Sequence, residues 1–82
     1  MVTAQQIKMA RSALDWSIER LSKETSVSSR TIMRIEDQSG VPSATKANMN
    51  MLVTTLEAAG IEFIGAPDDG PGVRLWLHFD SQ

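Results

Sequence analysis

The sequence predicts a mainly α-helical domain of four to five helices, followed by a short C-terminal β-hairpin or two-strand extension. Three hydroxyl residues mark helix starts within the first thirty positions, each followed by an amphipathic run. A fourth apolar helical run ends at Gly60, and two short apolar segments then flank a stretch rich in glycine and proline. We therefore expect a helical domain at 1–60 and a β extension, with a dimerisation role, at 61–82.

The first three helices begin with the same local pattern. Thr3, Ser17 and Ser28 are predicted N-cap residues, because their hydroxyl oxygen can accept a hydrogen bond from a backbone N–H of the first turn. Gln6, three residues after Thr3, completes a capping box. Each cap is also flanked by two apolar residues at the positions of a hydrophobic staple. These pairs are Val2 and Ile7, Trp16 and Leu21, and Val27 and Ile32.

The spacing of the later elements indicates how the helices connect. Only about three residues, 25–27, separate the second and third helices, which permits no more than a tight turn between crossed helices. Gly40 and Pro42 end the third helix. The fourth helix begins at Ser43 or Thr45 and ends before Gly60. Its predicted buried face consists of Met49, Leu52, Val53 and Leu56.

The last twenty residues predict two strands and a loop. Residues 61–64 form the first strand, 65–72 the loop and 73–79 the second strand. One face of the second strand carries Val73, Leu75, Leu77 and Phe79, and we expect it to pack on the fourth helix. Trp76 lies on the other face, where Ile64 joins it. Because an outer apolar patch usually marks an interaction site, we expect Ile64 and Trp76 to form a dimer interface. The alternative is that Trp76 folds back onto its own domain.

The composition argues against several classes of protein. The 82 residues contain no cysteine, so disulfides, thiolate metal sites and cysteine nucleophiles are excluded. The single histidine, His78, is expected to be exposed on a strand, and no glycine-rich phosphate loop is present. We therefore expect no enzyme activity, no cofactor and no metal. No apolar run approaches the roughly 20 residues that span a bilayer, so we expect no membrane association and a cytoplasmic location.

The charge is distributed unevenly along the chain. The net charge of −2 by itself argues against a polyanionic partner. Residues 1–46, however, carry seven basic against five acidic side chains, a net +2, whereas residues 47–82 carry one against five, a net −4. One half of the molecule can therefore face phosphate groups while the other half faces away.

The segment 16–36 resembles the DNA-binding unit of the Cro/C1-type (Xre) helix-turn-helix family of small bacterial and phage regulators. The most specific part is 27–36, which reads Val-Ser-x-x-Thr-Ile-x-x-Ile-Glu, and the resemblance covers about residues 5–60. It implies a λ-repressor-like fold and a homodimer that binds a palindromic operator in double-stranded DNA. It also implies association with the nucleoid when the protein is bound to DNA.

The resemblance also implies a set of DNA contacts. Ile32 and Ile35 point inward on the third helix, which leaves its polar residues outside, and arginine is the side chain best suited to a bidentate bond with guanine. The expected base contacts are Ser29, Arg30, Met33 and Arg34. The expected contacts to the DNA backbone are Ser17, Ser28, Thr31, Ser39, Ser43, Thr45 and Lys46.

Other positions match the family or depart from it. Arg11 and Glu36 match a family ion pair that joins the first helix to the end of the third, which gives Arg11 a structural role. Ile18 replaces the glutamine that many members use to bond a phosphate. Ser26 replaces a glycine in the turn, where a left-handed backbone is costly for serine. Asp37 lies close to the expected DNA surface and should weaken non-specific binding.

The resulting functional hypothesis is a transcriptional regulator, with repression favoured over activation. Two alternatives remain open at this point. One is the antitoxin of a toxin–antitoxin pair, whose C-terminal segment also holds the toxin. The other is a protein-binding antiactivator that kept the fold without DNA binding, which the sequence pI of 5.2 and Ile18 favour slightly. The protein partners in these cases would be RNA polymerase, a toxin or an activator.

Overall fold

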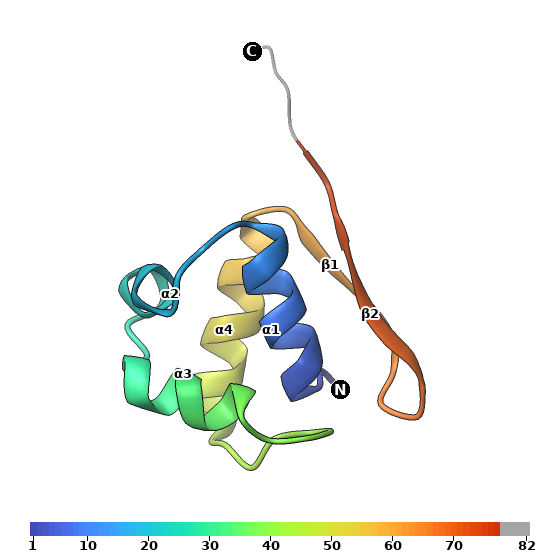
Figure 1. Cartoon of the computed structure of the whole chain (residues 1–82), viewed down its shortest axis with the longest axis horizontal. Helices are drawn as coiled ribbons and strands as arrows, with labels where there is room; N and C mark the ends of the chain where they lie inside the picture. The colour runs from blue at the N-terminus through green and yellow to red at the C-terminus, as the bar shows by residue number, and fades with distance from the viewer. Residues whose placement is uncertain (78–82) are drawn as a thin grey trace.

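The structure is a computed structural model that describes residues 1–77. In these residues four helices precede one antiparallel hairpin (Figure 1). The helices are α1 (Ala4–Ala13), α2 (Ile18–Thr25), α3 (Ser29–Glu36) and α4 (Lys46–Ala58). The strands are β1 (Ile61–Ala66) and β2 (Asp69–Leu75). The mainly α-helical class with a terminal hairpin is confirmed. Within residues 1–77 no helix has both the length and the apolar character needed to cross a membrane.

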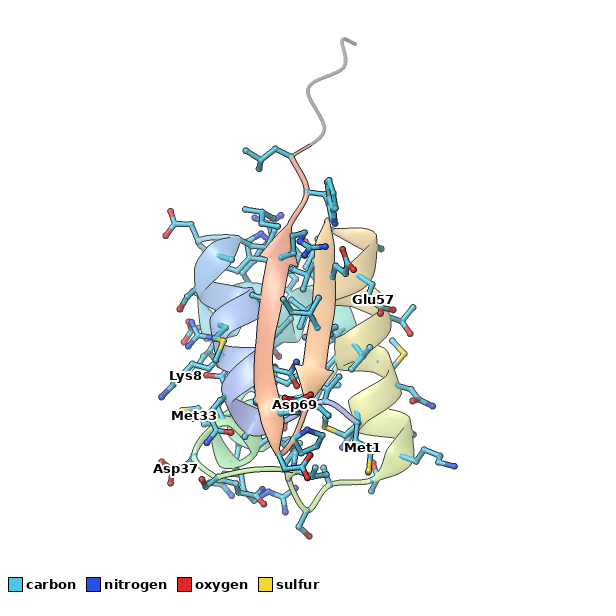
Figure 2. The ribbon with its side chains drawn as sticks, turned by 90° about the vertical axis from the view of Figure 1, so that its right-hand side faces the viewer. Met1, Lys8, Met33, Asp37, Glu57 and Asp69 are labelled. Carbon is cyan, nitrogen blue, oxygen red and sulfur yellow. The ribbon has the colours of Figure 1, made fainter. Side chains whose placement is uncertain are left out.

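Helices α1 and α4 form the middle of the molecule, between the α2–α3 pair and the hairpin (Figure 1). Strand β1 packs against α4 and strand β2 packs against α1, so the hairpin covers both central helices (Figure 2). The expectation that the second strand packs on the fourth helix is therefore wrong. Because β1 follows α4 directly through Gly60, it takes the place beside α4, and β2 lies one strand further across.

The core is built from the apolar positions that the helical spacing predicted. Ile7, Leu21, Ile32, Ile35 and Leu52 have no exposed surface and belong to one cluster. Burial of each such side chain contributes about 1.5–3 kcal/mol relative to exposure. Every helix of the domain therefore presents at least one fully buried side chain to the same core.

The helix starts agree with the predicted caps. The hydroxyl oxygens of Thr3, Ser17 and Ser28 each accept the backbone N–H three residues on, and Thr3 and Gln6 form the complete capping box. Thr45, one of the two alternatives, caps α4 in the same way. Each such cap contributes about 1 kcal/mol to helix stability. The N-terminal ends of the four helices are therefore set by local chemistry.

The predicted loop 65–72 is wrong, because most of these residues belong to the strands. The pairing runs from Ile61 opposite Leu75 to Ala66 opposite Asp69, which leaves a two-residue turn. The register shifts between Ile64 and Ala66, where β2 contains one residue more than β1. Gly65 has φ +80°, and a side chain there would collide with the backbone of Gly70. The glycines therefore permit a bulge next to a tight turn, and they do not mark a long loop.

The second strand also ends earlier than predicted. Leu77 follows β2 and is 62% exposed, so it does not share the buried face with Val73 and Leu75. His78 and Phe79, which were expected in this strand, lie outside the described residues. The apolar face of the described strand is therefore limited to the positions that lie over α1.

Candidate nucleic-acid interface

Helix α3 is anchored from one side and exposed on the other. Ile32 and Ile35 are completely buried, and the turn before α3 contains Ser26, whose left-handed backbone (φ +64°) ends α2. Arg30, Met33 and Arg34 are exposed on the opposite face, and Met33 keeps 52% of its surface accessible. Ser29, at the first turn of α3, is half-buried. The residues expected to contact bases thus all belong to one short helix, and three of them project from it.

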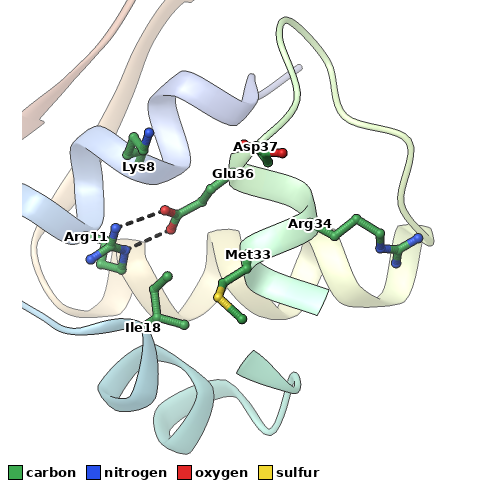
Figure 3. A pocket seen from close by; sticks show the side chains of 7 residues that line it. All are labelled: Lys8, Arg11, Ile18, Met33, Arg34, Glu36 and Asp37. Atoms are coloured by element: carbon green, nitrogen blue, oxygen red, sulfur yellow. Dashed lines mark hydrogen bonds and ion pairs between the residues drawn. The ribbon is translucent and has the colours of Figure 1, made fainter. Parts of the chain in front are cut away.

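An ion pair fixes the end of α3 to α1. Arg11 Nε lies 2.8 Å from Glu36 Oε2, and Arg11 Nη2 lies 2.9 Å from Glu36 Oε1 (Figure 3). Arg11 Nη1 also donates to the carbonyl oxygen of Trp16 at 3.0 Å, so the same guanidinium holds the chain that enters α2. This is the pair that the family resemblance implied. Because all three interactions point inward, Arg11 is a structural residue of the domain.

The ion pair shifts the titration of Arg11. Hydrogen bonding to the Glu36 carboxylate raises the pKa of Arg11 above its ordinary value, partial burial lowers it, and attraction to Glu36 and Glu19 raises it further. Since the net shift is upward, the stabilisation is fully present below the ordinary pKa of arginine and is lost only above it. Titration of Arg11 therefore breaks the pair only in strongly alkaline solution.

An open groove of about 620 Å³ lies beside α3 (Figure 3). Its walls come from α1, the first residue of α2 and the last turn of α3 with its C-cap. The lining residues are Lys8, Arg11, Ile18, Met33, Arg34, Glu36 and Asp37. Lys8 was not predicted as part of the site. Its sequence position, one turn before Arg11, was the only signal that could have placed it near the end of α3.

The hydroxyls expected to bind phosphate are partly engaged as helix caps. Ser17 accepts the backbone N–H of Arg20, and Thr45 accepts that of Asn48. Ser28 accepts the N–H of Thr31 and donates its own hydrogen to Thr31 Oγ1 at 2.9 Å. Within residues 1–77 the hydroxyl hydrogens of Ser17, Thr45 and Thr31 meet no protein acceptor. Lys46, exposed in the first turn of α4, lies next to the capping Thr45.

Two glutamines hold the segment between α3 and α4. Gln5 Nε2 donates to Ser39 Oγ at 3.1 Å, while its Oε1 accepts the N–H of Gly40 at 3.1 Å. Gln38 Oε1 accepts the N–H of Ser43 at 2.7 Å. Ser39 and Ser43, two of the serines expected to contact phosphate, therefore lie in a tethered segment. The Gln5 tether was not predicted, because Gln5 bonds residues more than thirty positions away and no local pattern encodes such a contact.

The outer face of the hairpin carries Ile64 and Trp76, as the strand alternation predicted, but the two are not adjacent. Between them lie the cross-strand partners Glu62 and Arg74, which form an ion pair with 3.2 Å between Glu62 Oε1 and Arg74 Nη1. Trp76 is 53% exposed, and its indole N–H donates to Glu62 Oε1 at 2.8 Å. Trp76 therefore rests on the hairpin and does not fold back onto the helical domain.

Comparison with models of known protein families, with curated proteins and with solved structures gave no match, so the function is inferred from the residues themselves.

Proposed function

We propose that this chain is a sequence-specific DNA-binding transcriptional regulator with a λ-repressor-like helix-turn-helix domain, and that α3 reads the major groove. The observation that carries the proposal is the arrangement of α3, which is held by two buried isoleucines and a partly buried ion pair while both of its arginines are exposed. A helix that reads a groove about 12 Å wide must project its reading side chains away from its own domain, and α3 meets this requirement.

The surroundings of α3 support contact with the phosphate backbone. The exposed Lys8, Lys46 and the two arginines of α3 supply positive charge. The first turns of α2, α3 and α4 present capped helix N-termini with hydroxyl groups, which are favourable positions for a phosphate. Phosphate contacts of this kind position a protein on DNA, whereas contacts to base edges specify the sequence.

The test is the selection of bound sequences from random DNA duplexes. The proposal predicts that variants of the base-reading arginines change the sequence preference, whereas a variant of a phosphate-binding lysine changes only the affinity. We expect Arg30→Ala and Arg34→Ala each to relax the preference at one defined base step, with a loss of about 5- to 150-fold at that step. Lys46→Ala should weaken all sequences alike and reduce the salt slope by about one, because it removes a phosphate contact.

Lys23→Ala is the matched control, since Lys23 is exposed on α2 and does not belong to the face of α3. Its selected sequence should equal that of the unmodified protein. Equal losses on all sequences from the three test variants would remove the base-reading roles. Failure to bind any duplex at low salt would contradict DNA binding altogether and favour the protein-binding alternative.

We further propose that two chains pair through the outer face of the hairpin, with Ile64 and Trp76 as the apolar contacts. The hairpin and α3 lie on different sides of the molecule, so such pairing leaves α3 uncovered in both chains (Figure 1). Glu62 and Arg74 lie side by side on this face, so a two-fold axis can bring each acid opposite a base. The two copies of α3 would then contact two DNA half-sites that are one turn of the double helix, about 34 Å, apart.

Sedimentation of a Trp76→Asp variant tests this interface. We expect the variant to sediment as a monomer, because the substitution replaces one of the two apolar contacts of this face by a carboxylate that the interface would bury. Met51→Asp is the control on α4, where Met51 is also exposed, and it should remain dimeric. A monomeric Met51→Asp with a dimeric Trp76→Asp would instead place the interface on α4.

A further inference from the structure

Met33 is an exposed apolar residue in the middle of a polar helix face. It lies between the reading arginines of α3, at positions i+3 from Arg30 and i−1 from Arg34, and half of its surface is accessible. Among residues 1–77, Ile32 and Ile35 supply the contacts of α3 with the hydrophobic core, to which Met33 does not belong. Met33 is therefore accessible to a ligand that approaches this face of α3.

Ile18 lies next to Met33 in the same groove. It is the first residue of α2, half-buried against the core, and both side chains line the groove beside α3. Figure 3 shows them entering the groove from α2 and from α3, below the Arg11–Glu36 ion pair. The two side chains form a small apolar subsite, which is surrounded by the charged groups of Lys8, Arg34 and Asp37.

The surroundings select the kind of molecule that this apolar subsite can receive. A protein partner that forms a stable complex buries about 800 Å² on each side, which two side chains within a charged groove do not offer. The exposed charges that line the groove are the cations Lys8 and Arg34 and the anion Asp37, and this net positive charge suits the phosphate backbone of DNA. Among the base edges in the major groove, only thymine presents an apolar group, its C5-methyl.

We infer that Met33 and Ile18 receive the C5-methyl group of a thymine in the DNA half-site, an inference that rests on the proposed function. Arg30 and Arg34 then bind guanines on the two sides of this thymine. Met33 recognises the intervening A·T pair by contact with the C5-methyl group of the thymine. Ile18, which stands where many members of the family have glutamine, has a role in this arrangement. A glutamine at this position would leave Met33 without an apolar neighbour in the groove.

Replacement of thymine by deoxyuridine tests the inference, because it removes the methyl group and keeps every hydrogen-bonding group. In the selected operator, each thymine is replaced in turn and the Kd is measured. We expect one thymine in each half-site to respond, with affinity falling about fourfold per half-site, the value for one buried methyl-sized group. The remaining positions should respond much less.

Variants assign the effect to the subsite. Met33→Ala should bind thymine and deoxyuridine operators equally, whereas Met33→Leu should keep the difference. Met51→Ala, which truncates an exposed methionine on α4, should behave as the unmodified protein. An operator that binds with a steep salt dependence but shows no response to deoxyuridine, or a response that persists in Met33→Ala, would overturn the inference and leave the proposed function intact. The absence of all duplex binding would overturn both.

Discussion

Replacement of Arg11 by methionine is expected to lower the free energy of unfolding by about 3–5 kcal/mol, the cost of removing one partner of a buried ion pair. The side chain of Glu36 is only 4% exposed, so its carboxylate would lose both guanidinium hydrogen bonds without gaining water. The carbonyl of Trp16 would lose its donor at the same time. Urea unfolding followed by circular dichroism measures the loss.

Two variants separate the ion pair from general effects of the substitution. Lys8→Met places the same side chain one turn earlier on α1, where the lysine is exposed, and should change stability by less than about 0.5 kcal/mol. Arg11→Met combined with Glu36→Met should recover most of the loss, because a buried pair replaced by apolar residues is often neutral or stabilising. If Arg11→Met alone is as stable as Lys8→Met, the ion pair does not hold α3.

The elements that local chemistry defines were predicted well. The four N-caps, the capping box and the buried stripes of the helices each depend on residues within one or two turns. The left-handed backbone at Ser26 was implied by the family resemblance, which places a glycine at this position of the turn. The exposed face of α3 followed from the same spacing, once Ile32 and Ile35 were placed in the core.

The elements that depend on contacts between distant segments were not predicted. Gly65, Gly70 and Pro71 are typical both of loops and of a tight turn with a bulge. The sequence therefore predicts two strands joined by an eight-residue loop, whereas the structure has the bulged tight turn. The position of β2 over α1 depends on how α1 and α4 pack. The groove beside α3 likewise brings together α1, α2 and α3, so Lys8 had no motif to identify it.

Gln6 is the strongest example of a role that only the folded chain shows. As part of the capping box, its Oε1 accepts the N–H of Thr3 at 2.8 Å. Its Nε2 donates to two carbonyl oxygens of the hairpin, those of Ile64 at 2.9 Å and Gly72 at 2.8 Å. These two residues are the last regular pair before the register shift. The amide of Gln6 therefore satisfies carbonyl groups next to the bulge and ties the hairpin to α1.

Gln6→Met should lower the free energy of unfolding by about 2–5 kcal/mol, because the buried groups that it bonds lose their partner. Gln6→Glu should be at least as destabilising at neutral pH, since a buried carboxylate would face two carbonyl oxygens. Burial favours the protonated acid and raises its folded pKa above the unfolded value, so Gln6→Glu should gain stability as the pH falls. Gln6→Met should show no such gain relative to the unmodified protein.

The neighbouring Gln5 provides the matched control, because its amide likewise both donates and accepts a hydrogen bond, with one donor bond where Gln6 has two, but it is exposed. Gln5→Met and Gln5→Glu should each cost less than about 1 kcal/mol, since water can replace the lost partners. Hydrogen exchange of the β1 and β2 amides then tests the tie itself, and in Gln6→Met these amides should exchange faster than the core amides of α4. Equal losses for the two glutamines, or unchanged exchange in the hairpin, would show that the hairpin is held to α1 by the apolar contacts of Phe63, Val73 and Leu75 alone.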